Sequence, residues 1–491
     1  MATRLTAGTP RWGSSGLWAE PRASRHSASD HTGRLCPSRG PPGTLSTMDR
    51  SLWAVLFGTF TLRFSTGLTG ALLIYYLAKL HEHHRILDQL LGLGSGQVVG
   101  PIAFGVVTAL FYVSELVFSP IFGVLSDRIG HHRVMQFGPV FGILAAVATW
   151  ATTSLPIIGA TRVLEGSATA SSVPSILGYI AAATADDEGL RGKAVARFEA
   201  ATLAGLISGF VVAGLLFPLL GPSAFLVNGA LYAASFAIYR FGVDERLDRP
   251  PKDDGEAGAS ANGNRSSLGH YWKILTGTHV WLLAPTWIAI NAVLGLYTTQ
   301  TICQMVRAPD PRFPGQLLMG GIESFQISIG LAVGGALFFA GLIYWGNRFK
   351  AIRRTTIILY GLGGGALIAV GAVAVNHSAG VPEILRLVFA IPIVFGLFVL
   401  AGATPAAIGL LADVTEAYPD DRGAIMGLYS VFLGLGQITG SLVAGFAASA
   451  FGLDGVLIAS VVLLGAAVVP LIALRRHEHI LGGAGGRAVL E

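Results

Sequence analysis

The sequence predicts an all-α membrane protein with twelve transmembrane helices in two pseudo-symmetric six-helix bundles. Three observations indicate this fold class. Of the 491 residues, 52% are hydrophobic and only 12% are charged, about half the charge of a soluble domain. Apolar stretches long enough to cross a hydrocarbon core of about 30 Å, which takes about 20 residues, recur along the chain. A polar interval from Asp244 to Lys273 divides these stretches into two sets of six.

The apolar stretches give the expected helices in order. The first set lies at residues 51–80, 101–126, 134–153, 155–183, 195–219 and 222–243. The second set lies at residues 274–302, 323–346, 355–376, 384–412, 424–450 and 452–474. The expected domains are a tail at 1–47, a bundle at 48–243, a cytoplasmic linker at 244–273, a second bundle at 274–476 and a tail at 477–491.

The polar segments differ from the bundles in composition. The linker is rich in Pro, Gly, Ser, Asn and charged residues, a composition that cannot bury itself. Residues 1–47 contain no apolar core of signal-peptide length. We expect them to be either a disordered cytoplasmic tail or an over-extended start, because Met48 directly precedes the first apolar stretch.

Lys and Arg residues predict the orientation in the membrane. With the first residue placed inside, 26 of the 33 fall on the inner side and two fall within helices, Arg63 and Arg162. Five fall outside: Lys79, Arg85, Arg307, Arg312 and Arg386. Because positively charged loops stay in the cytoplasm, both termini are predicted to be cytoplasmic in a multi-pass protein of the plasma membrane.

Several other classes of protein are disfavoured. The isoelectric point near 9.3 does not indicate nucleic-acid binding, because the basic residues are scattered over short loops. Cys36 and Cys303 support neither a disulfide framework nor a metal site. The run His81–His84 is more typical of a solvated loop than of a metal site. The glycine run 361–365 lacks the Lys and Ser/Thr of a phosphate loop. We therefore expect no metal, no cofactor and no enzymatic activity.

The two halves of the chain contain an internal repeat. Aligning Arg191-Gly192 with Arg422-Gly423 gives a constant offset of 231 residues. This offset superimposes Gly205, Gly209 and Gly214 on Gly436, Gly440 and Gly445. Their small-xxx-small spacing predicts that both helices, the fifth and the eleventh, allow close approach of a neighbouring helix.

The segment Gly123-Val-Leu-Ser-Asp127-Arg128-Ile-Gly130-His-His-Arg133 forms a short basic turn between two apolar stretches. It resembles the loop between the second and third helices of the major facilitator superfamily of secondary transporters. The resemblance implies alternating access by two bundles related by an axis along the membrane normal. It also implies that Asp127 contacts the N-terminal end of the eleventh helix and holds the cytoplasmic side closed, since a helix N-terminus favours an anion.

Four ionisable residues are predicted to lie at membrane depth. A charge there costs at least about 2.5–3.5 kcal/mol, so each is a functional candidate. Arg63 and Glu115 lie at similar depth on the first and second helices, whereas Arg162 and Glu165 share one face of the fourth. We expect Glu115 or Glu165 to carry a proton. The alternative is that Arg63 with Glu115, and Arg162 with Glu165, form structural ion pairs.

The segment Arg162-Val-Leu-Glu165-Gly166 is similar to the fourth-helix motif of the family's proton antiporters. The fifth helix lacks the Gly-Pro-x-x-Gly-Gly core that is typical of the drug/proton branch. In this superfamily the first and fourth helices line the central cavity. The resemblance therefore implies that Arg63 and Arg162 face the same water-filled space.

Polar side chains in the predicted helices of the second half are candidates for substrate binding. The alternative is that each makes an interhelical hydrogen bond, worth about 0.6 kcal/mol. These candidates are Asn291, Gln300, Gln304, Gln326 and Gln437, with Thr298 and Thr299 beside them.

We therefore predict a monomeric transporter that uses the proton gradient to export small amphipathic molecules. Its partners are the substrate, protons and the lipid bilayer, with no nucleic acid. The first alternative is an importer or symporter for a sugar or an organic anion, which the two arginines would suit. The second alternative is a transport-inactive receptor.

Overall fold

A computed structural model describes residues 43–80, 99–185, 187–248, 283–348, 351–417 and 422–481. Every regular element in these ranges is helical, so the all-α prediction is confirmed for this part of the chain. Most of both predicted tails, the linker beyond Asp248 and the run His81–His84 lie outside the described residues. Residues 1–44 form a unit separate from residues 45–491, and the second unit is the one described below.

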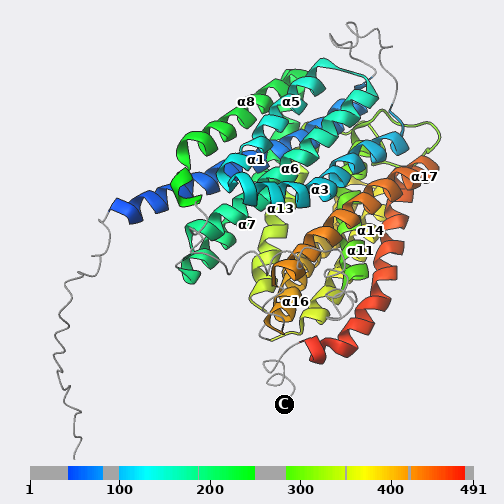
Figure 1. The fold of residues 1–491 in the computed structure, drawn as a ribbon. Helices are drawn as coiled ribbons and strands as arrows, with labels where there is room; N and C mark the ends of the chain where they lie inside the picture. Colours follow the sequence, from blue (N-terminus) through cyan, green and yellow to red (C-terminus); the bar gives the residue numbers. More distant parts are fainter. Residues whose placement is uncertain are drawn as a thin grey trace, which may run out of the picture. The chain divides into compact units, whose positions relative to one another are not determined.

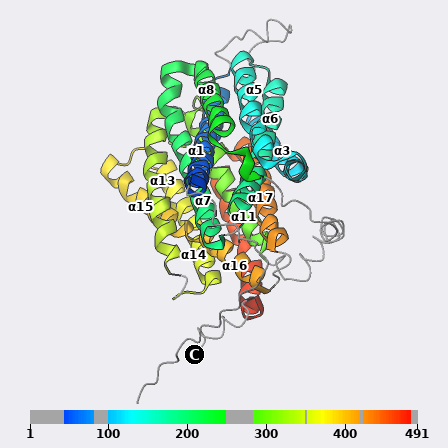
Figure 2. The same cartoon turned by 60° about the vertical axis from the view of Figure 1, so that its left-hand side comes forward.

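In the first half of the chain, up to Asp248, the described residues form four long helices and several short elements. Figures 1 and 2 show how these helices are arranged. The long helices are α1 (Gly43–Ala78), α3 (Pro101–Ile129), α6 (Leu155–Ala183) and α7 (Glu188–Leu220). The others are α4 (His131–Val134), α5 (Phe137–Ala151), η2 (Gly221–Ser223), α8 (Ala224–Ala237), η3 (Ile238–Gly242) and η4 (Glu245–Asp248). Their bounds follow the predicted apolar stretches closely.

In the second half, the described residues from 283 onward also form a series of long helices and short helical elements. These elements are α11 (Ala284–Leu296), the π-helical η6 (Tyr297–Thr301), α12 (Ile302–Val306), α13 (Ser324–Gly346), α14 (Arg354–Asn376), α15 (Glu383–Leu400), α16 (Ala403–Ala417) and α17 (Arg422–Leu481).

One boundary in the second half differs from the prediction. The expected helix at 384–412 is interrupted between α15 and α16 at Ala401 and Gly402, where a Cβ on Gly402 would meet the Trp345 ring at 2.6 Å. The element α17 contains two helices that meet at a kink at Gly452, which agrees with the break expected between residues 450 and 452. The φ of Gly452 is +64°, a left-handed value that glycine adopts readily.

Among the described residues, seven helical segments are long and apolar enough to cross a membrane. Two of them exceed a single crossing: Lys193–Gly242 has 50 residues and Ser430–Arg476 has 47. At 1.5 Å per residue each is about 70 Å or more in length, against a hydrocarbon core of about 30 Å. Each is broken near its middle, at Gly221–Ser223 and at Gly452.

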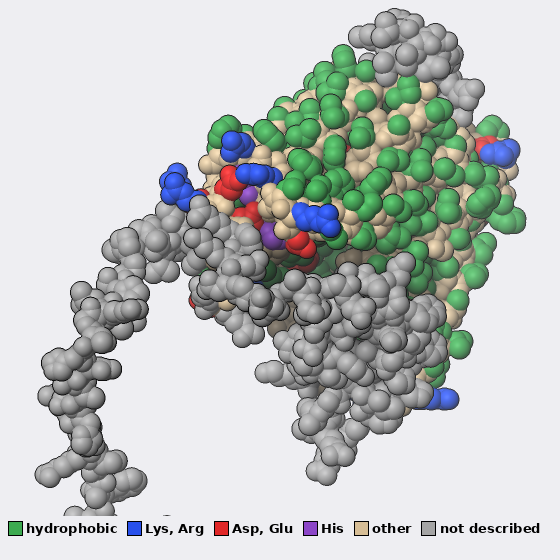
Figure 3. Space-filling model, in the orientation of Figure 1, with side chains coloured by type: hydrophobic (Ala, Val, Ile, Leu, Met, Phe, Trp, Pro, Cys, Tyr) green, Lys and Arg blue, Asp and Glu red, His purple; other side chains and the backbone are tan. Residues whose placement is uncertain are grey.

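The outward surface of these helices is apolar. On α3, the side chains of Val106, Val113, Val117 and Val124 are 40–54% exposed and share one helical face. Figure 3 shows hydrophobic side chains over most of the face in view, with charged and histidine side chains gathered mainly at one end. Exposed apolar area on this scale is suited to lipid rather than to water.

The buried core differs between the two ends of the helices. We call the end that contains Asp127–Arg133 the motif end and the other the opposite end. At the opposite end one hydrophobic cluster includes residues from both halves, joining Leu72 and Phe225 to Ile302 and Val306.

At the motif end each half has a core of its own among the described residues. Met135 and Tyr239 belong to a cluster built only from the first half. Trp345 and Leu410 belong to another, built only from the second half. The halves are thus joined by a common core at the opposite end.

Candidate functional site

The turn after α3 depends on Gly130. Its φ is +100°, in the left-handed region that favours glycine, and its N–H donates to the Ser126 carbonyl at 3.0 Å. A Cβ at this position would lie only 3.2 Å from Asp248 Oδ2. The sequence motif therefore needs glycine here for backbone conformation and for the approach of a carboxylate. Gly123, about two turns earlier on α3, lies near Pro174 of α6.

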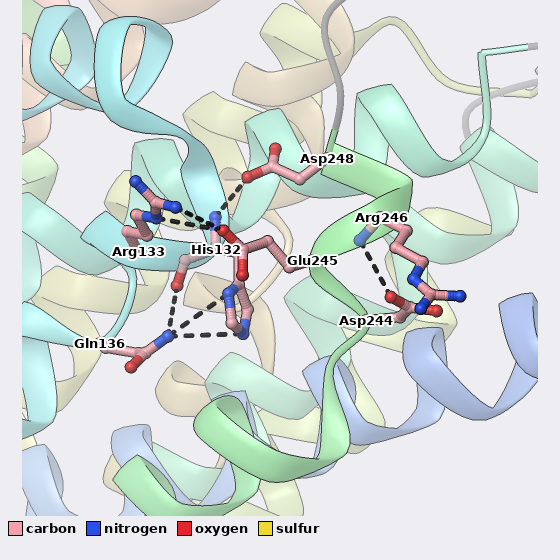
Figure 4. Close-up of polar contacts among 7 residues, drawn as sticks. All are labelled: His132, Arg133, Gln136, Asp244, Glu245, Arg246 and Asp248. Atoms are coloured by element: carbon pink, nitrogen blue, oxygen red, sulfur yellow. Dashed lines mark hydrogen bonds and ion pairs between the residues drawn. The ribbon is translucent and has the colours of Figure 1, made fainter.

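Asp248 anchors this turn to the segment that follows α8 (Figure 4). Its side chain is only 3% exposed and accepts the His132 backbone N–H at 2.7 Å. The other carboxylate oxygen lies 2.7 Å from His131 Nδ1. In the sequence Asp248 falls within the expected linker. The sequence offers one signal for its role: Asp248 is an acidic residue soon after the sixth predicted helix, and the turn after α3 is basic.

The rest of the turn is also bound to elements far away in sequence. The ring of His132 is buried, with Nε2 2.9 Å from the Tyr239 carbonyl. Arg133 and Glu245 form an exposed ion pair at 2.9 Å. Figure 4 shows the Arg133–Glu245 ion pair together with the bond between His132 and Asp248, which both join α4 to η4.

Asp127 is the least constrained member of the motif. Its side chain is 75% exposed, and its described partner is His131 Nε2 at 3.4 Å. Arg128 is also exposed. Of the five predicted gate residues, Gly123, Asp127 and Arg128 thus lie on α3, Gly130 forms the turn and Arg133 lies on α4. The side chains at the start of α17 lie outside the described residues, so the predicted contact between Asp127 and that helix stays a prediction.

Arg162 and Glu165 form an ion pair between Nη1 and Oε2, and both are almost fully buried. Arg162 Nε and Nη2 are buried without a hydrogen-bond partner. Thr69 of α1 interacts with Glu165, and its Oγ1 accepts a hydrogen bond from Asn228 of α8 at 2.5 Å. In this conformation Arg162 does not share an exposed space with Arg63, because Arg162 is buried inside the first half, where Glu165 neutralises its charge. This geometry fits the alternative stated above, in which the two residues form a structural ion pair.

Arg63, Glu115 and Glu199 form a second charged group, on α1, α3 and α7. Both carboxylates interact electrostatically with Arg63, but neither forms an ion pair within 4.0 Å among the described residues. Arg63 and Glu115 are half-buried and Glu199 is exposed. Glu115 is two residues from Val113 and Val117, about 200° around the helix, and so points away from the lipid-facing stripe.

Glu199 was missed by sequence reasoning. It lies inside the apolar stretch predicted at 195–219, so a carboxylate within a predicted span was a signal that could have found it. Its proximity to Arg63 arises because α7 packs closely against α1. A Cβ on Gly205 would meet Phe60 O at 2.5 Å and Arg63 Cβ at 3.0 Å.

The polar candidates of the second half lie in different surroundings. Gln300, on the π-helical η6, is buried, and neither side-chain atom has a hydrogen-bond partner. Gln304 Nε2 and Gln437 Oε1 are also buried and unpaired. By contrast, Asn291 Nδ2 donates to Trp287 O at 2.8 Å, and Gln326 is exposed. Buried unpaired amides next to a π-helical turn are candidates for ligand binding.

The six repeat glycines make matching contacts in the two halves. Gly205 and Gly209 face the backbone of α1, and Gly436 and Gly440 face that of α11. The third member of each set faces the other half of the chain.

Gly214 and Gly445 are these third members. Gly214 approaches Ser324 and Ser328 of α13, and Gly445 approaches Pro101 of α3. Each of the three glycines in the first half therefore contacts the same kind of neighbour as the glycine aligned with it in the second half.

A cavity of about 280 Å³ lies at the opposite end, where α1 and α7 meet α12 and α13. Its lining includes Tyr75, Lys79, Arg307 and Glu323. No group of three or more His, Cys, Asp or Glu that could hold a metal occurs within the described ranges.

Comparison with known proteins agrees with this arrangement. The family model described as the Major Facilitator Superfamily matches residues 55–389 and 321–487. The chain belongs to the major facilitator superfamily. As a member of this superfamily it is a multi-pass membrane transporter, and its substrate is a small molecule.

Two kinds of protein are similar to this superfamily member. The quinolone resistance protein NorA of Staphylococcus aureus (strain MSSA476) is 21% identical over 399 residues, which cover 81% of this chain and 90% of NorA. A crystal structure of the nucleoside transporter NupG has a TM-score of 0.63 at 12% identity and covers 87% of this chain and 98% of NupG. A crystal structure of a NupG point mutant has a TM-score of 0.58 at 13% identity, with coverage of 85% and 99%. The structural likeness shows the fold alone.

Proposed function

We propose that this transporter is a proton-coupled exporter of small amphipathic molecules in the plasma membrane. It would work by alternating access between two six-helix bundles, with both termini in the cytoplasm. The observation that carries the proposal is the Arg63, Glu115 and Glu199 group. It provides carboxylates inside the helical region that are accessible and not locked in an ion pair.

The internal repeat supports the two-bundle arrangement. Equivalent glycines contact equivalent helices in the two halves, as parallel repeats related by an axis along the membrane normal require. The asymmetry of Lys and Arg supports placing the motif end in the cytoplasm. A common core at the opposite end, and separate cores at the motif end, support a state that is open toward the cytoplasm.

Glu115 is the residue that we propose to carry the proton. A carboxylate that is alternately wetted and desolvated binds a proton in one state and releases it in the other. Arg63 would favour the ionised form while it is close and would permit protonation when the helices separate. Glu165 is held by Arg162 in a buried ion pair, so we assign it to stability of the first half.

The test is transport by purified protein in proteoliposomes, with a quinolone and a nucleoside as the two probes. The names of NorA and NupG suggest these classes. We expect pH-gradient-driven movement of the quinolone by the wild type. Glu115→Gln should abolish driven movement but retain exchange of labelled for unlabelled probe, whereas Glu165→Gln should chiefly lower protein stability.

The outcomes separate the alternatives. Driven movement that survives in Glu115→Gln but is lost in Glu165→Gln would reverse the assignment, and survival in both would exclude both as the carrier. Accumulation of the nucleoside or of an organic anion in the import direction would favour the importer, which the partly exposed Arg63 would suit. A protein that moves neither probe in any gradient would support the receptor.

A further inference from the structure

His131 lies between two carboxylates that belong to different elements. Its Nδ1 is 2.7 Å from Asp248 Oδ1 on η4, and its Nε2 is 3.4 Å from Asp127 Oδ1 on α3. The ring lies against Gly178 of α6, where any Cβ would collide with it. The imidazole is therefore fixed on one side by packing and by Asp248, while Asp127 on the other side is mostly exposed.

The two contacts have different proton requirements. A neutral imidazole carries one N–H, and the short bond to the buried Asp248 uses it at Nδ1. Nε2 then presents a lone pair to the Asp127 carboxylate, which is repulsive. Only the imidazolium donates to both carboxylates at once. The longer distance to Asp127 indicates a contact that is formed loosely and can be released.

We propose that His131 is a positioning residue for Asp127, which it holds when protonated and releases when neutral. Asp248 holds the imidazole of His131 in place while the contact with Asp127 forms and breaks. This inference rests on the proposed function in one respect: the motif end is the end that opens and closes. Holding Asp127 keeps it away from the second half, so acid on the motif side should favour the open motif end.

Other charged groups near His131 do not replace this role. Arg133 is engaged by Glu245, and the His132 ring is buried against Tyr239. On the elements packed against α4, the titratable or charged residues near the turn are Asp127 and Arg128 on α3, Tyr179 on α6, and Glu245, Arg246 and Asp248 on η4. Those further along these helices, at least twelve residues from the turn or from Gly178, are Tyr112 and Glu115 on α3 and Arg162 and Glu165 on α6.

The opposite end provides a matched control. There His377 Nε2 lies 2.8 Å from Asp454 Oδ2, and Asn376 donates to the other oxygen of the same carboxylate at 2.8 Å. Among the residues that the structure describes, this histidine contacts one carboxylate only. Replacing it alters a similar pair without altering the motif end.

The experiment measures the distance across the motif end by double electron–electron resonance. Spin labels are placed at two exposed positions outside the motif, Lys193→Cys on α7 and Arg348→Cys after α13, in the full chain of a variant that lacks Cys36 and Cys303. Distances are recorded in lipid nanodiscs between about pH 5 and 8, where histidine changes its charge. Size-exclusion profiles of each variant serve as the folding check.

We expect acid pH to raise the long-distance population severalfold in the wild type. His131→Gln and Asp127→Asn should both abolish this pH response, whereas His377→Gln should retain it. Asp127→Asn changes an exposed side chain, so it keeps the test valid if His131→Gln fails to fold. A pH response that persists in either variant, or is missing in the wild type, would overturn the proposal. Because no substrate is needed, failure of transport and failure of this switch are separate results.

Discussion

The two ends of the molecule are joined in different ways. At the opposite end the halves share a hydrophobic cluster and approach through small residues, with Gly214 against Ser324 and Gly445 against Pro101. At the motif end each half has its own cluster, and the described contacts of the turn stay within the first half. Close-packed apolar contacts hold the halves together at one end, whereas charged groups organise the other.

This difference suggests which end moves first. Apolar packing is lost only when many contacts separate together. Ionic contacts near the surface contribute little stability and respond to protons and salt. We infer that the motif end is the adjustable one and that the opposite end sets the resting state. Four predictions test this comparison, from the largest expected effect to the smallest.

The largest effect is expected from Gly214→Leu. The added side chain would collide with the Ser324 carbonyl and force α7 from α13 at the opposite end. Overpacking costs about 1–3 kcal/mol, which corresponds to about a 5- to 150-fold change in the population ratio. Spin labels at Lys79→Cys and Glu323→Cys, beside the cavity, should report a longer distance.

The control is Gly330→Leu on α13, where a Cβ would meet nothing within 4 Å. It should leave the distance unchanged. If Gly214→Leu shows the same distance as Gly330→Leu, the contact at this glycine does not determine closure of the opposite end.

The next prediction concerns Asp127→Asn. A negative charge at a helix N-terminus is worth about 0.3–1 kcal/mol, and up to about 2 kcal/mol in partly buried geometry. Because Asp127 is 75% exposed here, folding should be unaffected. We expect most transport to be lost and the motif end to become more accessible to thiol reagents at single cysteines. Wild-type flux in this variant would show that Asp127 does not hold the motif end closed.

A smaller effect on transport, although a larger one on stability, is expected from Asp248→Ala. It leaves the His132 N–H without its acceptor and removes the anchor of His131. Hydrogen bonds to a charged group contribute about 1.5–3 kcal/mol, so we expect a lower melting temperature and faster hydrogen exchange in the turn after α3. Asp248→Asn retains one acceptor oxygen, so its melting temperature should lie between those of the wild type and Asp248→Ala. Equal melting temperatures for all three proteins would show that the anchor is not structural.

Much of the fold could be predicted from composition and periodicity alone. The predicted stretch 155–183 coincides with α6, because an apolar run bounded by Thr, Ser and Pro specifies a helix locally. The repeat at offset 231 correctly identified glycines that approach other helices. The break predicted between residues 450 and 452 coincides with the kink at Gly452, whereas the interruption at Ala401 and Gly402 lies inside an apolar stretch that showed no boundary.

The site was less predictable, because its contacts join distant segments. Asp127 and Arg133 could be found from their motif, but Asp248 and His131 meet across 117 residues. Likewise, nothing local distinguishes Glu199 as a neighbour of Arg63 until α7 is packed against α1. Arg162 and Glu165 were predicted to share a face, which they do; their burial depends on surrounding helices that no local pattern specifies.

The smallest effect is expected from Arg312→Gln, in the loop at the opposite end. Arg312 Nη2 donates to Asp310 Oδ2 at 2.7 Å, and this bond holds the pKa of the Asp310 carboxyl below its usual range. The stability that a lowered folded-state pKa contributes is fully present above the pKa of the unfolded chain and is lost as the pH falls through the folded value. Between about pH 5 and 8 the pair therefore makes its full contribution, but that contribution is small because Arg312 is 64% exposed, so we expect no measurable change in melting temperature or flux. The interior of the opposite end, rather than its surface charges, would then account for its closure. A clear loss of stability at neutral pH would instead show that surface ion pairs contribute at both ends, which would weaken the contrast between them.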